Sequence, residues 1–177
     1  MIQHSIDPVY DGHSRVLILG SFPSVKSRET AFFYGHPQNR FWKVLAAVFG
    51  QNLPVTIEEK KAFLLANRIA LWDMIGQCEI TGSSDSSIKN VAVNDVSVIL
   101  RQTNIRQIYV NGKTAEKFYN RYLRNNLGRD AVCLPSTSPA NASYSLPRLI
   151  EAWNCIRLDI SPGNDIISLT WRVVRAV

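Results

Sequence analysis

Four short apolar runs, set apart by polar and turn-forming segments, dominate the pattern of hydrophobic positions along the chain. Each run is too short for a helix, and isolated runs of this kind are typical of strands buried in a sheet. The expected strands are residues 16–19, 69–72, 108–110 and 132–134.

Segments with helical spacing lie between and after these runs. Apolar residues at i, i+1, i+4, i+7 and i+8 from Phe41 fall on one face of a helix. Thr56 and Glu59 form a capping-box pattern that opens another helix. The other expected helices are 95–100, capped by Asn94 or Asp95, 113–123, and a last one with Pro147 in its first turn. Residues 165–177 fit either an edge strand or a closing helix.

Strands that alternate with helices predict an α/β fold with a parallel sheet covered by helices on both faces. A length of 177 residues suits one full-sized core, so we expect residues 1–177 to form a single domain. In such a sheet the ligand binds beyond the carboxyl ends of the strands. Four loops are expected there: residues 20–39, 73–89, 111–114 and 135–145.

Composition and charge narrow the classes of function. The apolar content of 46% is that of an ordinary globular protein, and no apolar run approaches the roughly 20 residues that span a bilayer. The first residues lack the features of a signal peptide, so we expect a cytoplasmic protein that does not enter membranes. A net charge of +6 favours a polyanionic partner such as nucleic acid, although many basic proteins bind none.

The cysteines and the common catalytic motifs exclude further classes. Cys78, Cys133 and Cys155 are widely spaced and form no C-x-x-C pair, which argues against a zinc ribbon or an iron–sulfur cluster. We expect reduced thiols, no metal and no cofactor. The chain also lacks a Walker A loop, a G-x-S-x-G elbow and an H-E-x-x-H motif.

The densest set of candidate functional residues is the segment 34–42, just before the helix that begins at Phe41. It places His36, Asn39 and Arg40 among aromatic residues that include Tyr34. An aromatic ring can grip a flat base, and His36 or Asn39 can polarise or orient a water. Asn39 also stands where asparagine commonly caps a helix, and a lone histidine is often structural, so both readings stay open.

The ends of the first two expected strands carry a second set of candidates. Ser21 and Phe22 follow the first strand, where backbone N–H groups can face a substrate and Phe22 can stack on a base or fill the core. Asp73 follows the second strand, where its carboxylate can read the edge of a base, cap a helix or form a local salt bridge.

Hydroxyl-rich and basic residues are candidates for contact with phosphate. The loop after the fourth strand offers side-chain and backbone donors, and basic residues occur in and near the first and third loops. A solvated surface is the alternative for all of them. The candidate DNA contacts are Ser24, Lys26, Arg40, Lys113, Ser136, Thr137, Ser138 and Asn141.

Taken together, these motifs resemble the uracil-DNA glycosylase superfamily. G-S-F-P-S at residues 20–24 is similar to its G-x-x-P-G motif, and L-P-S-T-S at 134–138 is similar to its H-P-S-P-L-S or N-P-S-G-L-S motif. The segment H-P-Q-N-R-F-W-K-V at 36–44 closely resembles that of the mismatch-specific uracil/thymine glycosylases. Residues 71–75 lie where those enzymes carry L-T-N-L-V.

Two departures from the superfamily pattern point to one branch of it. Phe22 replaces the usual acid or amide of the first motif, and Leu134 replaces the usual histidine or asparagine of the second. The remaining combination resembles the hypoxanthine-DNA glycosylase branch, often counted as the sixth family. In that branch the asparagine of H-P-Q-N-R-F-W is catalytic, which implies the same role for Asn39.

The resemblance implies a three-layer α/β/α sandwich with a central parallel four-stranded sheet and a monofunctional DNA glycosylase of base excision repair. We expect it to flip deaminated bases, chiefly hypoxanthine, out of DNA and to hydrolyse the N-glycosidic bond by water attack at C1′. We expect a monomer. The alternatives are a mismatch-specific uracil/thymine-DNA glycosylase, a non-catalytic module that binds damaged DNA, and a hydrolase of free nucleosides.

Overall fold

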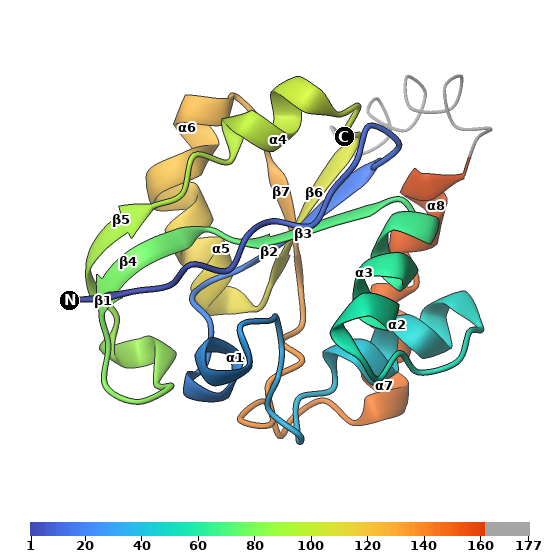
Figure 1. The fold of residues 1–177 in the computed structure, drawn as a ribbon, viewed down its shortest axis with the longest axis horizontal. Coiled ribbons are helices and arrows are strands. Elements are labelled where there is room, and N and C mark those ends of the chain that lie inside the picture. The colour runs from blue at the N-terminus through green and yellow to red at the C-terminus, as the bar shows by residue number, and fades with distance from the viewer. Residues whose placement is uncertain (162–177) are drawn as a thin grey trace, which may run out of the picture.

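The computed structural model describes residues 1–161 and centres on a parallel four-stranded sheet (Figure 1). Its strand order is β3-β2-β6-β7, with β2 paired to β3 on one side and to β6 on the other. These are the four strands expected from the apolar runs. Their bounds are β2 (Val16–Gly20), β3 (Ile69–Asp73), β6 (Gln107–Asn111) and β7 (Ala131–Leu134).

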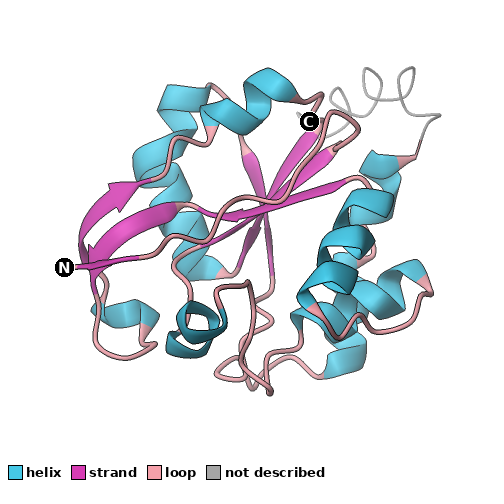
Figure 2. Cartoon of the chain, in the orientation of Figure 1, coloured by secondary structure: helices cyan, strands magenta, loops and turns pink. Residues whose placement is uncertain are grey.

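Helices cover both faces of this sheet, as Figure 2 shows. Val16 and Ile18 of β2 pack into one buried cluster, and Leu17 and Leu19 pack into another, because successive side chains of a strand point to opposite faces. The first cluster includes residues of α2 (Phe41–Phe49), α3 (Ile57–Ala66), α7 (Leu146–Trp153) and α8 (Ile156–Ile160). The second includes residues of α4 (Ser97–Gln102), α5 (Lys113–Phe118) and the π-helical turn η2 (Tyr119–Leu123), which continues into α6 (Arg124–Leu127). The expected α/β/α sandwich is confirmed.

A second, antiparallel sheet was not expected from the sequence, and one of its strands lies within the predicted loop 73–89. It has the order β1-β4-β5, with β1 (Ile2–Gln3), β4 (Ile75–Glu79) and β5 (Lys89–Val93). The prediction of a loop over residues 73–89 was therefore wrong at its start. β4 was not predicted because glycine and glutamine interrupt its apolar positions, although Ile75 and Cys78 are buried.

Local capping confirms several expected helix starts. The side chains of Thr56 and Glu59 form the predicted capping box of α3. Pro147 lies in the first turn of α7. A short helix that the sequence analysis did not expect, α1 (Val25–Thr30), begins at Ser24, whose hydroxyl accepts from the backbone N–H of Ser27.

Within residues 1–161, no helix combines the length and the apolar character needed to cross a membrane. The edge strand or closing helix expected over residues 165–177 lies outside the described residues.

Candidate active site

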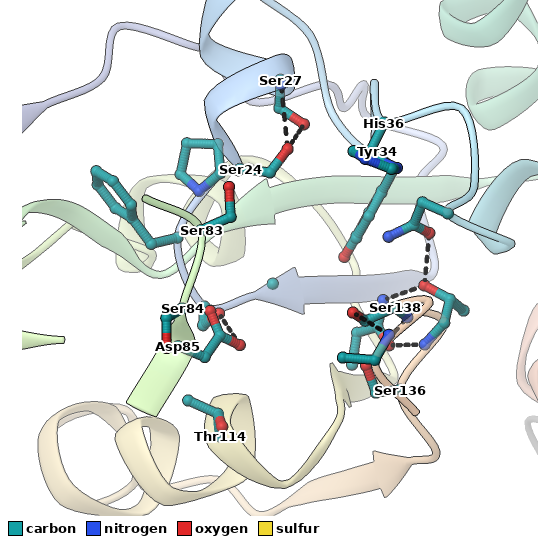
Figure 3. Close-up of a pocket in the computed structure, with 18 of the residues that line it drawn as sticks. Ser24, Ser27, Tyr34, His36, Ser83, Ser84, Asp85, Thr114, Ser136 and Ser138 are labelled. Carbon is teal, nitrogen blue, oxygen red and sulfur yellow. Dashed lines mark hydrogen bonds between the residues drawn. The ribbon is translucent and has the colours of Figure 1, made fainter. Parts of the chain in front are cut away.

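A cavity of about 620 Å³ opens at the carboxyl ends of the parallel strands, a size ordinary for a small-molecule site. All four loops selected from the sequence contribute to its lining (Figure 3). Most of the predicted site residues line it: Ser21, Phe22, Ser24, Tyr34, His36, Asn39, Asp73, Ser136, Thr137, Ser138 and Asn141. The three basic candidates, Lys26, Arg40 and Lys113, do not.

Asp73 forms part of the cavity wall at the end of β3. It pairs in register with Gly20 of β2, and a β-carbon on Gly20 would lie 2.2 Å from Asp73 Oδ1. Only glycine therefore leaves room for this carboxylate. Asp73 is 4% exposed, and among the described residues no group hydrogen-bonds to its carboxylate. Burial, followed by the nearby charge of Asp85, raises the pKa of Asp73 to about 7.

Tyr34 brings an aromatic ring to the same wall. Its ring stacks on Phe41 with centroids 3.9 Å apart, and its backbone has φ of +52°. The Tyr34 hydroxyl extends toward the middle of the cavity in Figure 3, is buried, and has no hydrogen-bond partner in the described chain. It would lie 3.1 Å from a β-carbon on Gly20, so it is close to the Asp73 carboxylate. Burial, and next the charge of Asp73, raise the pKa of Tyr34, with Asn111 nearby as a weaker opposing influence.

Asn39 has its side-chain oxygen fully engaged and its side-chain nitrogen free. Oδ1 accepts from the backbone N–H of Phe41 and from Thr137 Oγ1, both at 3.0 Å. Asn39 precedes Arg40, the N-cap residue of α2, so its bond to the Phe41 N–H supports the start of this helix, and Asn39 also lines the cavity. No described group bonds to its Nδ2, so this N–H₂ group is available to a water or a substrate. Asn39 can therefore support the start of the helix through its oxygen and orient a water through its nitrogen, the two roles that the sequence left open.

Thr137 was predicted to contact DNA, and the structure corrects this. Thr137 is fully buried and links the site together. Its backbone N–H donates to Asn111 Oδ1, and its hydroxyl accepts from Asn111 Nδ2 while donating to Asn39 Oδ1. Because these bonds occupy the hydroxyl, Thr137 fixes the orientation of Asn39 and does not face a phosphate.

Arg40 also takes a role different from the predicted phosphate contact. Its guanidinium donates to the backbone carbonyls of Ser138 at 2.7 Å and Asn141 at 3.0 Å, and also to that of Tyr144. Its Nε donates to Thr137 O. These bonds hold the loop after β7 against the start of α2, so the structure favours Arg40 as an anchor of this loop.

Phe22 has less free surface than the predicted stacking role requires. It is 6% exposed, with the ring of His4 against it at 5.4 Å and the Arg28 guanidinium over its face at 5.3 Å. The structure therefore favours Tyr34 over Phe22 as the residue that stacks on a base. His36 is exposed at the rim, where its Nδ1 accepts from the backbone N–H of Gln38.

The remaining predicted contacts surround the opening. Ser136, Ser138 and Asn141 belong to the loop after β7, in which Asn141 Nδ2 donates to Ser136 O at 2.9 Å. Lys26 and Lys113 are exposed, each paired with a glutamate three residues later. Both lysines remain candidates for phosphate contact.

Among the lining residues that were not singled out from the sequence, Asn111 and Asp85 contact predicted site residues, and both fall in the predicted loops. Asn111 ends β6 and bonds to Thr137, as above. Asp85 belongs to the short 3-10 helix η1 (Asp85–Ser87), and its Oδ2 accepts from Ser21 Oγ at 3.2 Å. A carboxylate within the hydroxyl-rich run T-G-S-S-D-S-S at 81–87 was the signal available for Asp85.

The described residues contain no cluster of three or more histidine, cysteine or acidic side chains arranged to hold a metal. The chemistry offered is that of a cavity large enough for a small molecule, with one buried acceptor, one aromatic ring and an oriented amide. A cavity beyond the carboxyl ends of the strands is where open parallel α/β sheets bind their ligands, so the fold and the lining together mark this cavity as the candidate active site.

Comparison with known proteins gives the family. The sequence profile of the Uracil DNA glycosylase superfamily matches residues 8–157, and the chain belongs to this superfamily. It is 37% identical over 158 residues to the Hypoxanthine DNA glycosylase of Methanosarcina acetivorans, covering 88% of this chain and 98% of that protein. The Hypoxanthine DNA glycosylase of Methanosarcina barkeri is 32% identical over 143 residues, covering 80% and 89%.

A solved structure shows the same fold. The solution NMR structure of a Methanosarcina acetivorans protein, described as a candidate uracil DNA glycosylase, superposes with a TM-score of 0.77. The two chains are 33% identical, and the match covers 90% of this chain and 99% of the other.

Proposed function

We propose that this protein is a monofunctional DNA glycosylase that removes deaminated bases, chiefly hypoxanthine, from DNA. The observation that carries the proposal is the Asp73 carboxylate, which is buried in the wall of the cavity and accepts no hydrogen bond from a described residue. Unpaired buried carboxylates are costly, so a ligand that donates a hydrogen bond there is expected. The names of the two relatives support hypoxanthine as that ligand.

Hypoxanthine and adenine differ at the edge that Asp73 would meet. An ionised carboxylate only accepts hydrogen bonds. Hypoxanthine offers an N1–H donor, whereas adenine offers a lone pair at N1, which the carboxylate repels. Asp73 would therefore admit the deaminated base and reject its parent. Guanine also carries N1–H, so its exclusion must come from the shape of the cavity around the 2-amino group.

The hydrolysis requires a nucleotide flipped out of the duplex, a base stacked in the cavity and a water positioned to attack C1′. One face of the Tyr34 ring packs on Phe41, and the base would stack on the other face. Asn39 would donate from Nδ2 to the water that attacks C1′. The C1′–N9 bond breaks with its electron pair leaving on the base, the water oxygen bonds to C1′, and a proton from the water ends on the departing base, directly or through solvent. The products are free hypoxanthine and an abasic site.

The DNA would lie across the mouth of the cavity. The rim residues Ser24, Ser136, Ser138 and Asn141 would face its phosphates, and Lys26 and Lys113 would add attraction at longer range. We further propose that the enzyme works as a cytoplasmic monomer without metal or cofactor.

Uracil is the second candidate substrate, because its N3–H would meet Asp73 as N1–H of hypoxanthine does. The test is excision from labelled duplexes that carry hypoxanthine, uracil, xanthine or thymine, followed by alkaline cleavage of abasic sites. The proposal expects fastest cleavage of the hypoxanthine duplex in the presence of a chelator. Faster cleavage of uracil would favour the mismatch enzyme, and binding without cleavage of any duplex would favour a non-catalytic module.

A further inference from the structure

Asp85 is a second carboxylate in the cavity, and nothing in the proposed reaction uses it so far. It lies on η1, in the segment between β4 and β5, and faces the cavity across from Tyr34 (Figure 3). The Ser21 hydroxyl donates to its Oδ2 at 3.2 Å, which ties η1 to the end of β2. Among the described residues that line the cavity, only Asp73 and Asp85 carry a carboxylate.

A carboxylate at this place opposes DNA binding. The chain carries a net charge of +6, which attracts phosphate, whereas the negative charge of Asp85 repels it. A residue that weakens binding without other effect would gain nothing from being held by Ser21.

Asp73 and Asp85 lie at different depths in the cavity, which suggests different roles for their carboxylates. Asp73 is 4% exposed, whereas Asp85 as a residue is exposed at the side of the opening. A flipped nucleotide enters base first, so its sugar remains nearer the opening. Asp73 therefore lies within reach of the base, and Asp85 lies at the level of the sugar.

We propose that the Asp85 carboxylate stabilises the positive charge that develops on the deoxyribose as the glycosidic bond breaks. This inference rests on the proposed function. Cleavage of a glycosidic bond passes through a sugar with oxocarbenium character. The C1′–N9 electron pair leaves on the base, the positive charge spreads over C1′ and the ring oxygen, and water then bonds to C1′. Fixed negative charge at that point acts mainly in the transition state.

Ser21 is a positioning residue in this scheme. Its hydroxyl donates to one oxygen of Asp85 and favours the ionised form, whereas partial desolvation of the carboxylate against the cavity wall raises the pKa of Asp85. The competing reading is that the bond between Ser21 and Asp85 only fastens η1. The two readings differ in their effects on binding and on the chemical step.

The experiment measures DNA affinity and single-turnover excision of hypoxanthine separately, for the parent and for Asp85→Asn, Asp85→Glu and Ser21→Ala. Asp130→Asn is the matched control. It removes one exposed negative charge at the amino end of β7, the opposite end of the sheet from the cavity. Thermal unfolding of each variant checks the fold.

We expect Asp85→Asn to bind DNA as tightly as the parent or more tightly, while its single-turnover rate falls by roughly 100-fold. Asp85→Glu should recover part of the rate, Ser21→Ala should lose less than Asp85→Asn, and Asp130→Asn should cleave like the parent. A normal rate in Asp85→Asn overturns the inference, as does a loss explained by weaker binding or a lower melting temperature. An inactive parent enzyme would instead overturn the proposed function.

Discussion

Replacing Asp73 by asparagine should stabilise the protein at high pH and impair base recognition. The amide has nearly the shape of the carboxylate but does not ionise. Asp73 has a folded-state pKa of about 7 against an ordinary value of 3.8, because burial and Asp85 disfavour its charge. That difference corresponds to a free energy on the order of 4 kcal/mol between the two protonation states.

The sign of the pH dependence follows from the raised pKa. The folded protein binds the Asp73 proton more tightly than the unfolded chain does. The favourable contribution is therefore complete below pH 4 and is lost as the pH rises through 7. Above pH 8 the parent contains an ionised, unpaired carboxylate and Asp73→Asn does not. The variant should then be more stable by up to a few kcal/mol, whereas at pH 4 the two should match.

The assay combines urea unfolding of both proteins from pH 4 to pH 9 with single-turnover excision of hypoxanthine at pH 8. A hydrogen bond to a charged group contributes about 1.5 to 3 kcal/mol, so Asp73→Asn should excise roughly 10- to 150-fold more slowly. Some activity should remain because the amide can turn its oxygen toward N1–H. Parallel stability curves for the two proteins, or an unchanged excision rate, would refute the assignment of Asp73.

Three further predictions concern other parts of the site. Asn39→Ala should lower turnover roughly 100-fold or more while DNA binding persists, whereas a residue that only caps α2 would cost about 1 kcal/mol of stability and leave turnover near normal. Affinity for DNA should fall steeply as the salt concentration rises, and Lys113→Ala should make that dependence less steep. Arg40→Ala should leave the salt dependence unchanged and lower the melting temperature. A less steep salt dependence in Arg40→Ala would show that Arg40 contacts phosphate after all. Tyr34→Phe removes a buried hydroxyl without a partner, so calorimetry should show a gain of about 1 kcal/mol, and a loss would reveal a bond that the structure lacks.

The sequence predicted the sheet and the position of the site for a physical reason. Buried parallel strands are apolar throughout, so they stand out as short runs, and their carboxyl ends define where a ligand binds. The antiparallel sheet was missed because only Ile75 and Cys78 of β4 are buried apolar residues and because its pairing with β5 is irregular. Such strands carry a weak pattern in a single sequence.

The side-chain roles were harder to predict because they depend on contacts between distant residues. Asn39 was identified, but its orientation depends on Thr137, which lies 98 positions away and whose burial the sequence does not reveal. Arg40 looks like a phosphate ligand until the carbonyls of the loop after β7 are placed around it. The place of Asp85 in the site depends on its contact with Ser21, which lies 64 positions earlier in the chain.

The most direct test of the proposed function is to identify the released base. Excess enzyme is incubated with a duplex containing one deoxyinosine, and the released small molecules and the DNA are analysed by mass spectrometry. The controls are the Asn39→Ala variant and the same duplex with deoxyadenosine in place of deoxyinosine. We expect one equivalent of free hypoxanthine, an abasic strand, no protein–DNA adduct trapped by borohydride, and no adenine from the control duplex. Intact deoxyinosine after prolonged incubation, or release of the nucleoside in place of the base, would contradict it.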